Sequence, residues 1–290
     1  MTQWTLGILG GSGLYDIPGL EAAREETVDT PWGSPSAPLM RGTLHGIDLV
    51  FLPRHGRGHA LTPTAVPYKA NIDALKRAGC TDILSFSACG SLQEAYAPGD
   101  FVAVDQFIDR TFAREKSFFG PGMVAHVSMA HPVCERLSAL GADAAAAQGV
   151  TVHRGGTYLA MEGPQFSSLA ESRLYRQWGC DVIGMTNMPE AKLAREAELP
   201  YATLAMVTDY DCWHEEEENV SVTNVLEIMG QNAAYARGAI AQLCEVLSST
   251  QRTPSPQGIE TVLDFALITA PDARDPVLLA KLDAVAGRVL

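Results

Sequence analysis

The stretch "SSLAESRLYRQWGCDVIGMTNMPEAKLAREAELPYATLAMVTDYD", residues 167–211, decides the fold class because its hydrophobic pattern changes period three times. Residues 167–179 and 188–199 carry apolar side chains at helical spacing, whereas 180–185 and 200–211 are short apolar runs of strand length. Strands that alternate with helices in this way form parallel or mixed sheets covered by helices. The sequence therefore predicts an α/β protein.

The same alternation continues toward both ends of the chain, without an internal repeat. We expect further strands or hairpins at residues 4–13, 39–53, 81–91, 100–109 and 156–166, and helices at 65–80, 131–149 and 221–247. Residues 248–258 are polar and contain proline, so they predict a connector. We accordingly expect one domain at residues 1–250, followed by a polar linker and a helical tail at residues 251–290.

The composition argues against several classes of partner. The formal net charge is −13, whereas nucleic-acid binding needs a basic face. No apolar run approaches the roughly 20 residues of a membrane span, and the first residues lack the basic region of a signal peptide. The six cysteines are scattered without zinc-site spacing, as is typical of reduced thiols. We expect a cytoplasmic protein without nucleic-acid or membrane partners, and any anion must be bound locally.

Ligands of α/β sheets bind just beyond the carboxyl ends of the strands, so the residues that follow each strand are candidates. The turn "GGSG", residues 10–13, fits neither the dinucleotide fingerprint nor the P-loop, yet its N–H groups and the Ser12 hydroxyl suit an anion. "RHGRGH", residues 54–59, offers guanidinium groups, each able to pair with two phosphate oxygens, and imidazoles as further donors. Alone, each stretch is also explained as a plain turn or a solvated loop. Together with other strand ends they predict one site for a tetrahedral anion, formed by Ser12, Arg54, His55, Ser87, Ala88 and Thr186.

Two aspartates, Asp209 and Asp211, end the last strand in "VTDYDCW", and three interpretations stay open. Carboxylates at i and i+2 of an extended segment lie on the same side, as in some sites for a divalent metal. Alternatively, burial in a dry pocket and the negative charge of the second aspartate keep one carboxyl protonated, while the other carboxyl accepts a hydrogen bond. In the third interpretation the pair is only a polar strand end. The glutamates that follow are expected to form a solvated loop or helix start.

Several motifs occur in a characteristic order: "GGSGL", "RHG", "ACGS", "EGPQFSSLAES", "GMTNMPEAKLARE" and "TDYDCW". With them, the chain resembles the trimeric purine nucleoside phosphorylases from about residue 5 to about residue 247, and in particular those that act on 5′-methylthioadenosine. The resemblance implies a single α/β domain with a central mixed, partly barrel-like sheet flanked by helices. It also implies phosphorolysis of 5′-methylthioadenosine to adenine and 5-methylthioribose 1-phosphate, with inorganic phosphate as co-substrate and without a metal or organic cofactor. A homotrimer with sites at its interfaces is implied as well.

The resemblance further implies a role for each residue that matches a family motif. The phosphate contacts are those of the anion site above. The other roles are a ribose contact for Met185, base contacts for Phe166, Ser167 and Asp211, catalysis for Asp209, and a 5′-methylthio pocket of Val222, Val225, Leu226 and, from a neighbouring subunit, His126. The tail at residues 251–290 would act as a lid or a trimer contact.

The chemistry explains why such a site needs an anion and an acid. Breaking the bond between ribose and a purine builds positive charge on the sugar and negative charge on the base. Phosphate steadies the sugar and attacks C1′, and an acid neutralises the base at N7. We expect Asp209 to donate this proton, and Asp211 to accept from the N6 amine and to raise the pKa of Asp209.

The same pair favours a 6-aminopurine, because a carboxylate accepts from the N6 amine but is repelled by the O6 of a 6-oxopurine. Two other functions stay open. A phosphorylase of 6-oxopurine nucleosides or methylthioinosine would share the fold, although Asp209 counts against it. A metal-dependent glycosyl transferase would instead use Asp209-x-Asp211 to hold a divalent cation.

Overall fold

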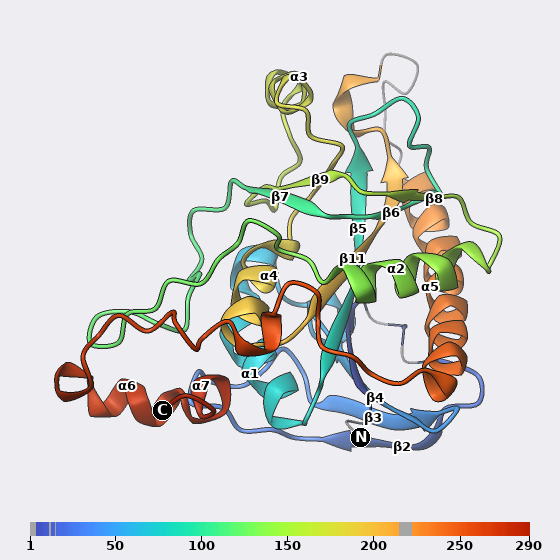
Figure 1. The fold of residues 1–290 in the computed structure, drawn as a ribbon. Helices are drawn as coiled ribbons and strands as arrows, with labels where there is room; N and C mark the ends of the chain where they lie inside the picture. Colours follow the sequence, from blue (N-terminus) through green and yellow to red (C-terminus); the bar gives the residue numbers. More distant parts are fainter. Residues whose placement is uncertain (1–3, 12, 15, 215–221) are drawn as a thin grey trace.

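The computed structural model describes residues 4–11, 13–14, 16–214 and 222–290. Within them, one large mixed sheet carries helices on both faces (Figure 1). This confirms the α/β architecture that the sequence predicts, with a mixed sheet flanked by helices.

The strands of the sheet are short, apart from two near its centre. In chain order they are β1 (Thr5–Gly10), β2 (Glu21–Glu26), β3 (Leu39–Leu44), β4 (Ile47–Pro53), β5 (Asp82–Ser91), β6 (Phe101–Ala103), β7 (Gln106–Asp109), β8 (Val152–Arg154), β9 (Thr157–Ala160), β10 (Val182–Gly184) and β11 (Tyr201–Asp209). The main path runs β2-β3-β4-β1-β5-β10-β9-β7, and β11, β6 and β8 branch from β5. Figure 1 shows β7, β9, β6 and β8 lying across the upper ends of β5 and β11.

Parallel pairing places several strand ends at one edge of the sheet. Strand β1 is parallel to β4 and β5, and β5 is parallel to β11. The carboxyl ends of β4, β5 and β11 therefore lie at neighbouring positions, where we expect the ligand.

The expected hairpin is present, since Leu44 pairs with Ile47 across a turn of His45 and Gly46, both with positive φ.

Helices cover the sheet because each has one apolar face. Their bounds are α1 (Tyr68–Arg77), α2 (Glu135–Ala146), α3 (Leu169–Gln177), α4 (Asn187–Glu196), α5 (Val222–Ser249), α6 (Pro276–Lys281) and α7 (Asp283–Ala286). Helices α1 and α4 share one buried cluster, which contains Leu75 and Leu193. Helices α2 and α5 contribute to the other, which contains Leu137 and Leu243. In the described part of the chain, no helix combines the length and the apolar character that crossing a membrane requires.

The structure differs from the sequence prediction in two places. Residues 100–109 form two strands, β6 and β7, where we expected one. Residues 87–91 were expected to follow a strand, but they lie inside β5. The strand continues because β11 pairs with it from Ile83 to Gly90, and β10 pairs with Gly90 and Ser91 beyond the residues that pair with β1.

The tail packs against the main body at its start and near its end. Its side chains Leu263, Leu282 and Val285 are buried in the cluster of α1 and α4. At its start, the Arg252 guanidinium pairs with the buried Asp82 carboxylate at 2.6 Å. These contacts anchor the tail on the face of α1 and α4, whereas its expected function as a lid or a trimer contact stays a prediction.

Candidate active site

The structure brings together hydroxyl groups that are far apart in the sequence. Ser87 in β5 and Thr186 just before α4 are both buried, and their hydroxyl oxygens lie 3.2 Å apart. The Tyr158 hydroxyl lies 3.4 Å from that of Ser87. Two of the predicted anion contacts are thus neighbours, while Ser12 lies outside the described residues.

Arg54 follows β4 and is buried, but it is not free to bind a phosphate with two N–H groups. Its Nε and Nη2 donate to the carboxylate oxygens of Glu190 at 2.6 and 2.9 Å. Nη2 also donates to the Ser85 hydroxyl at 2.6 Å, and Nη1 donates to the Phe86 carbonyl at 3.2 Å. Because a guanidinium has five N–H groups, one remains. The Glu190 carboxylate occupies the paired N–H groups of Nε and Nη2, so one N–H of Nη1 is left for phosphate, and the phosphate contact of Arg54 stays a prediction.

His55 adjoins Arg54, and its ring is held from two sides. Its Nδ1 lies 2.8 Å from the Leu61 carbonyl oxygen, and the ring stacks on His59 with 4.2 Å between centroids. Burial lowers the pKa of His55 to about 4. A carbonyl can only accept, so Nδ1 carries the proton of a neutral ring and Nε2 is an acceptor. The sequence predicts a further donor at this position, whereas the bond to Leu61 favours a neutral ring with Nε2 as acceptor; the phosphate contact of His55 stays a prediction.

The two aspartates do not lie on one extended segment. Strand β11 ends at Asp209, after an irregularity in its pairing with β5 at Thr208. Asp211 begins a short 3-10 helix (Asp211–Trp213) and has a φ of 54°. Asp209 Oδ1 accepts from the Asp211 backbone N–H at 2.9 Å, and Oδ2 accepts from the Thr208 hydroxyl at 2.7 Å. The i, i+2 geometry behind the metal interpretation is therefore absent from this pair.

Asp211 is the more deeply buried carboxyl of the two. Its Oδ2 is enclosed, and the Ser172 and Ser167 hydroxyls lie close to the carboxyl, although none forms a well-aligned hydrogen bond with Oδ2 among the described residues. Burial raises the pKa of Asp211 and the nearby Asp209 raises it further, against the two hydroxyls, which lower it. From the sequence we expected the reverse arrangement, in which Asp211 raises the pKa of Asp209. The chain turns inward at residue 211, which the residue types alone do not reveal.

The other predicted base contacts lie beside this pair. Ser167 is buried, and its carbonyl oxygen accepts from the Cys212 thiol at 3.4 Å. This bond joins the segment "EGPQFSS" to the turn that carries Asp211. The Phe166 side chain is 79% exposed, so within a single chain it has no partner that would fix it over a base.

An ion pair that we did not predict supports the ribose side. The buried Arg114 donates to the Glu162 carboxylate at 3.0 Å, to the Met188 carbonyl at 2.8 Å, and also to the carbonyl of Met185, the predicted ribose contact. Burial opposes ionisation of Glu162, but hydrogen bonds from Thr64 and from two backbone N–H groups lower its pKa to about 2. Arg114 thus holds two segments of the site wall together. In the sequence, the only indication of this ion pair is the acidic residue Glu162, which stands next to the glycine and proline of the motif "EGPQF".

The predicted 5′ pocket is described in part. Val222 and Val225 belong to α5, but their side chains lie outside the described part, and Leu226 is exposed. His126 is exposed, and its backbone N–H donates to the Ala266 carbonyl of the tail at 2.9 Å. No hydrogen bond or ring contact joins His126 to the aspartates in the described part of one chain.

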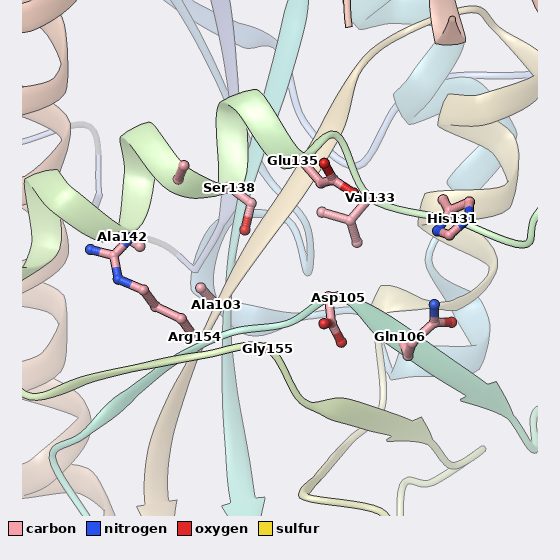
Figure 2. A pocket seen from close by; sticks show the side chains of 11 residues that line it. Ala103, Asp105, Gln106, His131, Val133, Glu135, Ser138, Ala142, Arg154 and Gly155 are labelled. Atoms are coloured by element: carbon pink, nitrogen blue, oxygen red, sulfur yellow. The ribbon is translucent and has the colours of Figure 1, made fainter. Parts of the chain in front are cut away.

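A separate cavity of about 340 Å³ lies between α2 and the turns at residues 103–106 and 154–155. Figure 2 shows Asp105, Glu135 and Arg154 around it. None of the predicted site residues lines it, and Arg154 is paired with Asp143 at 2.5 Å. Across the described residues, we find no group of three or more His, Cys, Asp or Glu side chains arranged to hold a metal ion.

The α/β fold, with its mixed sheet and covering helices, and the comparisons with known proteins define a class of enzyme. The chain belongs to the phosphorylase superfamily, whose family model matches residues 5–245. It is similar to the S-methyl-5′-thioadenosine phosphorylase of Cereibacter sphaeroides, with 65% identity over 98% of each chain. It is also similar to that of Bradyrhizobium diazoefficiens, with 60% identity over 100% of this chain and 99% of the relative.

Solved structures show the same likeness. A methylthioadenosine phosphorylase from an antarctic soil metagenomic library superposes with a TM-score of 0.92 at 45% identity, covering 98% of this chain and 99% of the other. The methylthioadenosine phosphorylase of Schistosoma mansoni, in complex with adenine, superposes with a TM-score of 0.83 at 38% identity, covering 90% and 98%. These values confirm the family resemblance that the sequence motifs indicate.

Proposed function

We propose that this chain catalyses the phosphorolysis of 5′-methylthioadenosine, with inorganic phosphate as co-substrate. The observation that carries the proposal is the buried pair of Ser87 and Thr186 hydroxyls, 3.2 Å apart, together with the buried Asp211 carboxyl just beyond β11. Relatives at 60% and 65% identity carry this activity in their names. All six cysteines are free thiols, which fits the reducing cytoplasm as the place of action.

The hydroxyl side of the site suits the attacking anion. The Ser87 and Thr186 hydroxyls and the remaining N–H of Arg54 can each donate to a phosphate oxygen. An anion held below the sugar stabilises the positive charge that develops at C1′ and lies in position to attack it. A C1′–O bond to phosphate forms while the C1′–N9 bond breaks, and the electron pair of the broken bond stays on the base.

The aspartate side suits an adenine base. The Asp211 carboxyl is buried, and its Oδ2 can accept a hydrogen bond from a ligand in addition to its contacts with the Ser167 and Ser172 hydroxyls. The N6 amine of adenine is a suitable donor, whereas O6 of a 6-oxopurine is another acceptor. We assign the transfer of a proton to N7 to Asp209, next to it. The adenine complex of the Schistosoma mansoni relative supports this choice of base.

A substrate panel tests the proposal. The protein is incubated with methylthioadenosine, adenosine or inosine, with and without phosphate, and the free base is measured. We expect adenine from methylthioadenosine only when phosphate is present, slower release from adenosine, and no hypoxanthine from inosine. EDTA should leave the rate unchanged. Release of hypoxanthine at a similar rate, or loss of activity in EDTA, would favour one of the competing functions.

We also propose that the chain forms a homotrimer in which His126 completes the site of a neighbour. Around His126 lies an exposed apolar patch, which we define as Val124, Phe265 and Ile268. Phe265 is 97% exposed, and the Ile268 N–H donates to the Val124 carbonyl at 2.9 Å, which fixes the tail beside His126. Exposed apolar patches of this kind mark interaction surfaces. Sedimentation should give the mass of three chains, and Ile268→Asp should lower it.

A further inference from the structure

The indole of Trp213 holds the short 3-10 helix that begins with Asp211. Its Nε1 donates to the carbonyl of Ser91, the last residue of β5, at 2.8 Å. The Arg176 guanidinium of α3 lies over the indole, with 3.5 Å between Cζ and the ring centroid. Arg176 Nε also donates to the Leu92 carbonyl at 3.0 Å. Trp213 is thus joined both to the end of β5 and to α3.

Helix α3 contacts both ends of this 3-10 helix with one face. Ser172 and Arg176 are four residues apart, so their side chains lie on the same side of α3. Ser172 is buried, and its hydroxyl lies close to the Asp211 carboxyl, where it opposes the rise in pKa that burial causes. Arg176, one turn further on, meets the indole of Trp213. A complete capping box stabilises the first turn of α3, so the helix is a firm support for both contacts.

Packing alone does not require the two polar contacts of the indole. The ring of Trp213 is partly buried against the small apolar cluster that contains Tyr175, and another aromatic ring could also occupy this space. The hydrogen bond to Ser91 and the guanidinium of Arg176 fix where the ring lies. Because the 3-10 helix has only three residues, the position of the ring also fixes that of Asp211.

We propose that Trp213 and Arg176 form a clamp that positions the Asp211 carboxyl to accept a hydrogen bond from the N6 amine of adenine. The inference rests on the proposed function, which places the base beside Asp211. Both members of the clamp are positioning residues, which act on the base through the carboxyl. A hydrogen bond weakens steeply when its distance and angle change, so loss of the clamp should weaken the contact with the N6 amine. The phosphate side of the site should keep its affinity, because its hydroxyl groups belong to other elements.

The binding of free bases separates this role from packing. Dissociation constants of adenine, unsubstituted purine and inorganic phosphate are measured by calorimetry for the wild type and for Trp213→Phe, which keeps an aromatic ring without an N–H group. We expect the affinity for adenine to fall by about fivefold to tenfold, as for loss of one hydrogen bond. Purine, which lacks the N6 amine, should lose less than about twofold, and phosphate should be unaffected. Trp178→Phe, a second tryptophan with an arginine over its ring, serves as the control.

The clamp is overturned if Trp213→Phe weakens adenine and purine equally, or if the wild type binds adenine no more tightly than purine. Equal losses would mean that the indole only fills space.

Arg176→Met tests the other half of the clamp at an exposed position, where the variant is expected to fold. The affinity for adenine relative to purine should fall by about threefold, as for loss of a cation–π contact. Arg173→Met, on the same helix and also exposed, should leave this ratio unchanged. A wild-type ratio in Arg176→Met would contradict the part assigned to Arg176. Phosphorolysis of methylthioadenosine is measured on the same samples, so a wild type that binds adenine without releasing it from the nucleoside would refute the proposed function and not the clamp.

Discussion

At the scale of single residues, the aspartate pair depends on a glycine in the neighbouring strand. Gly90 of β5 pairs with Asp209 of β11. A Cβ at position 90 would lie 3.0 Å from Asp209 Oδ1, 3.2 Å from Ile183 Cγ2 and 3.4 Å from Asp211 Cβ. Any side chain at this position must therefore displace the carboxyl that we assign to the base.

We predict that Gly90→Ala lowers kcat/KM for the nucleoside by about tenfold, because the Asp209 carboxyl must shift by a few tenths of an ångström and a shift of about 1 Å in a positioned site costs about a hundredfold. The free energy of unfolding should change by less, about 1–3 kcal/mol as for other overpacked positions. Steady-state kinetics and urea unfolding measure the two effects. Gly120→Ala, where a Cβ would meet nothing within 4 Å, serves as the control. Unchanged kinetics in Gly90→Ala would show that the pair is not held against β5.

Single residues also mark where sequence reasoning ends. Ser87 and Thr186 were expected to meet as two strand ends, but the structure brings them together differently: β10 runs antiparallel to the end of β5, so Thr186, beyond β10, lies beside Ser87 inside β5. The partner of Arg54 could not be predicted, since Glu190 is 136 positions away and no pattern links the two. The inward turn at Asp211 depends on a positive φ, and only glycine residues indicate a positive φ reliably in a sequence.

At the scale of elements, the hydrophobic period predicted the strands and helices of the core. Strand β11 and helix α1 are clear cases, since their apolar positions follow the expected spacing and are buried. Strand β2, "EAAREE", has no such pattern, and it pairs only with β3 at the edge of the sheet. Strand β2 forms because β3 offers it a partner for hydrogen bonding, so the hydrophobic period of its own residues could not reveal it.

The break between β6 and β7 has a similar cause. Residues 101–109 contain two apolar stretches separated by Asp105 and Gln106; β6 pairs with β11 and β8, while β7 pairs with β9. The two strands belong to different branches of the sheet, so the chain must bend between them. The two polar residues mark the break, but which strands each half pairs with is a tertiary property that the local sequence does not give.

At the scale of the whole molecule, one buried carboxyl makes stability depend on pH. Glu196, at the end of α4, accepts from the Ser117 hydroxyl and from the Phe118 N–H, both at 2.7 Å. It thereby ties the segment that leads to His126 to the core. Burial raises its pKa from 4.5 to about 7, although these hydrogen bonds act in the opposite direction.

The raised pKa of Glu196 determines whether the free energy of unfolding rises or falls with pH. The folded state binds the proton of Glu196 more tightly than the unfolded state, so the contribution is fully present below about pH 4.5 and is lost as the pH rises to about 7. Between these values we expect the free energy of unfolding to fall by about 3 kcal/mol on account of this group. Urea unfolding of the wild type and Glu196→Gln, at one protein concentration, isolates the effect as a difference. A difference that does not change between pH 5 and pH 8 would contradict it.

The central claim concerns the whole site, in which an anion pocket and an aspartate pair act together on a 6-aminopurine nucleoside. Its most direct test is the kinetics of Asp209→Asn with methylthioadenosine and inosine at saturating phosphate. We predict that kcat for methylthioadenosine falls by about a hundredfold or more, as for loss of a general acid. The preference for methylthioadenosine over inosine should also narrow, because the amide can donate to N7. Unchanged turnover of methylthioadenosine, with inosine still refused, would contradict the assignment.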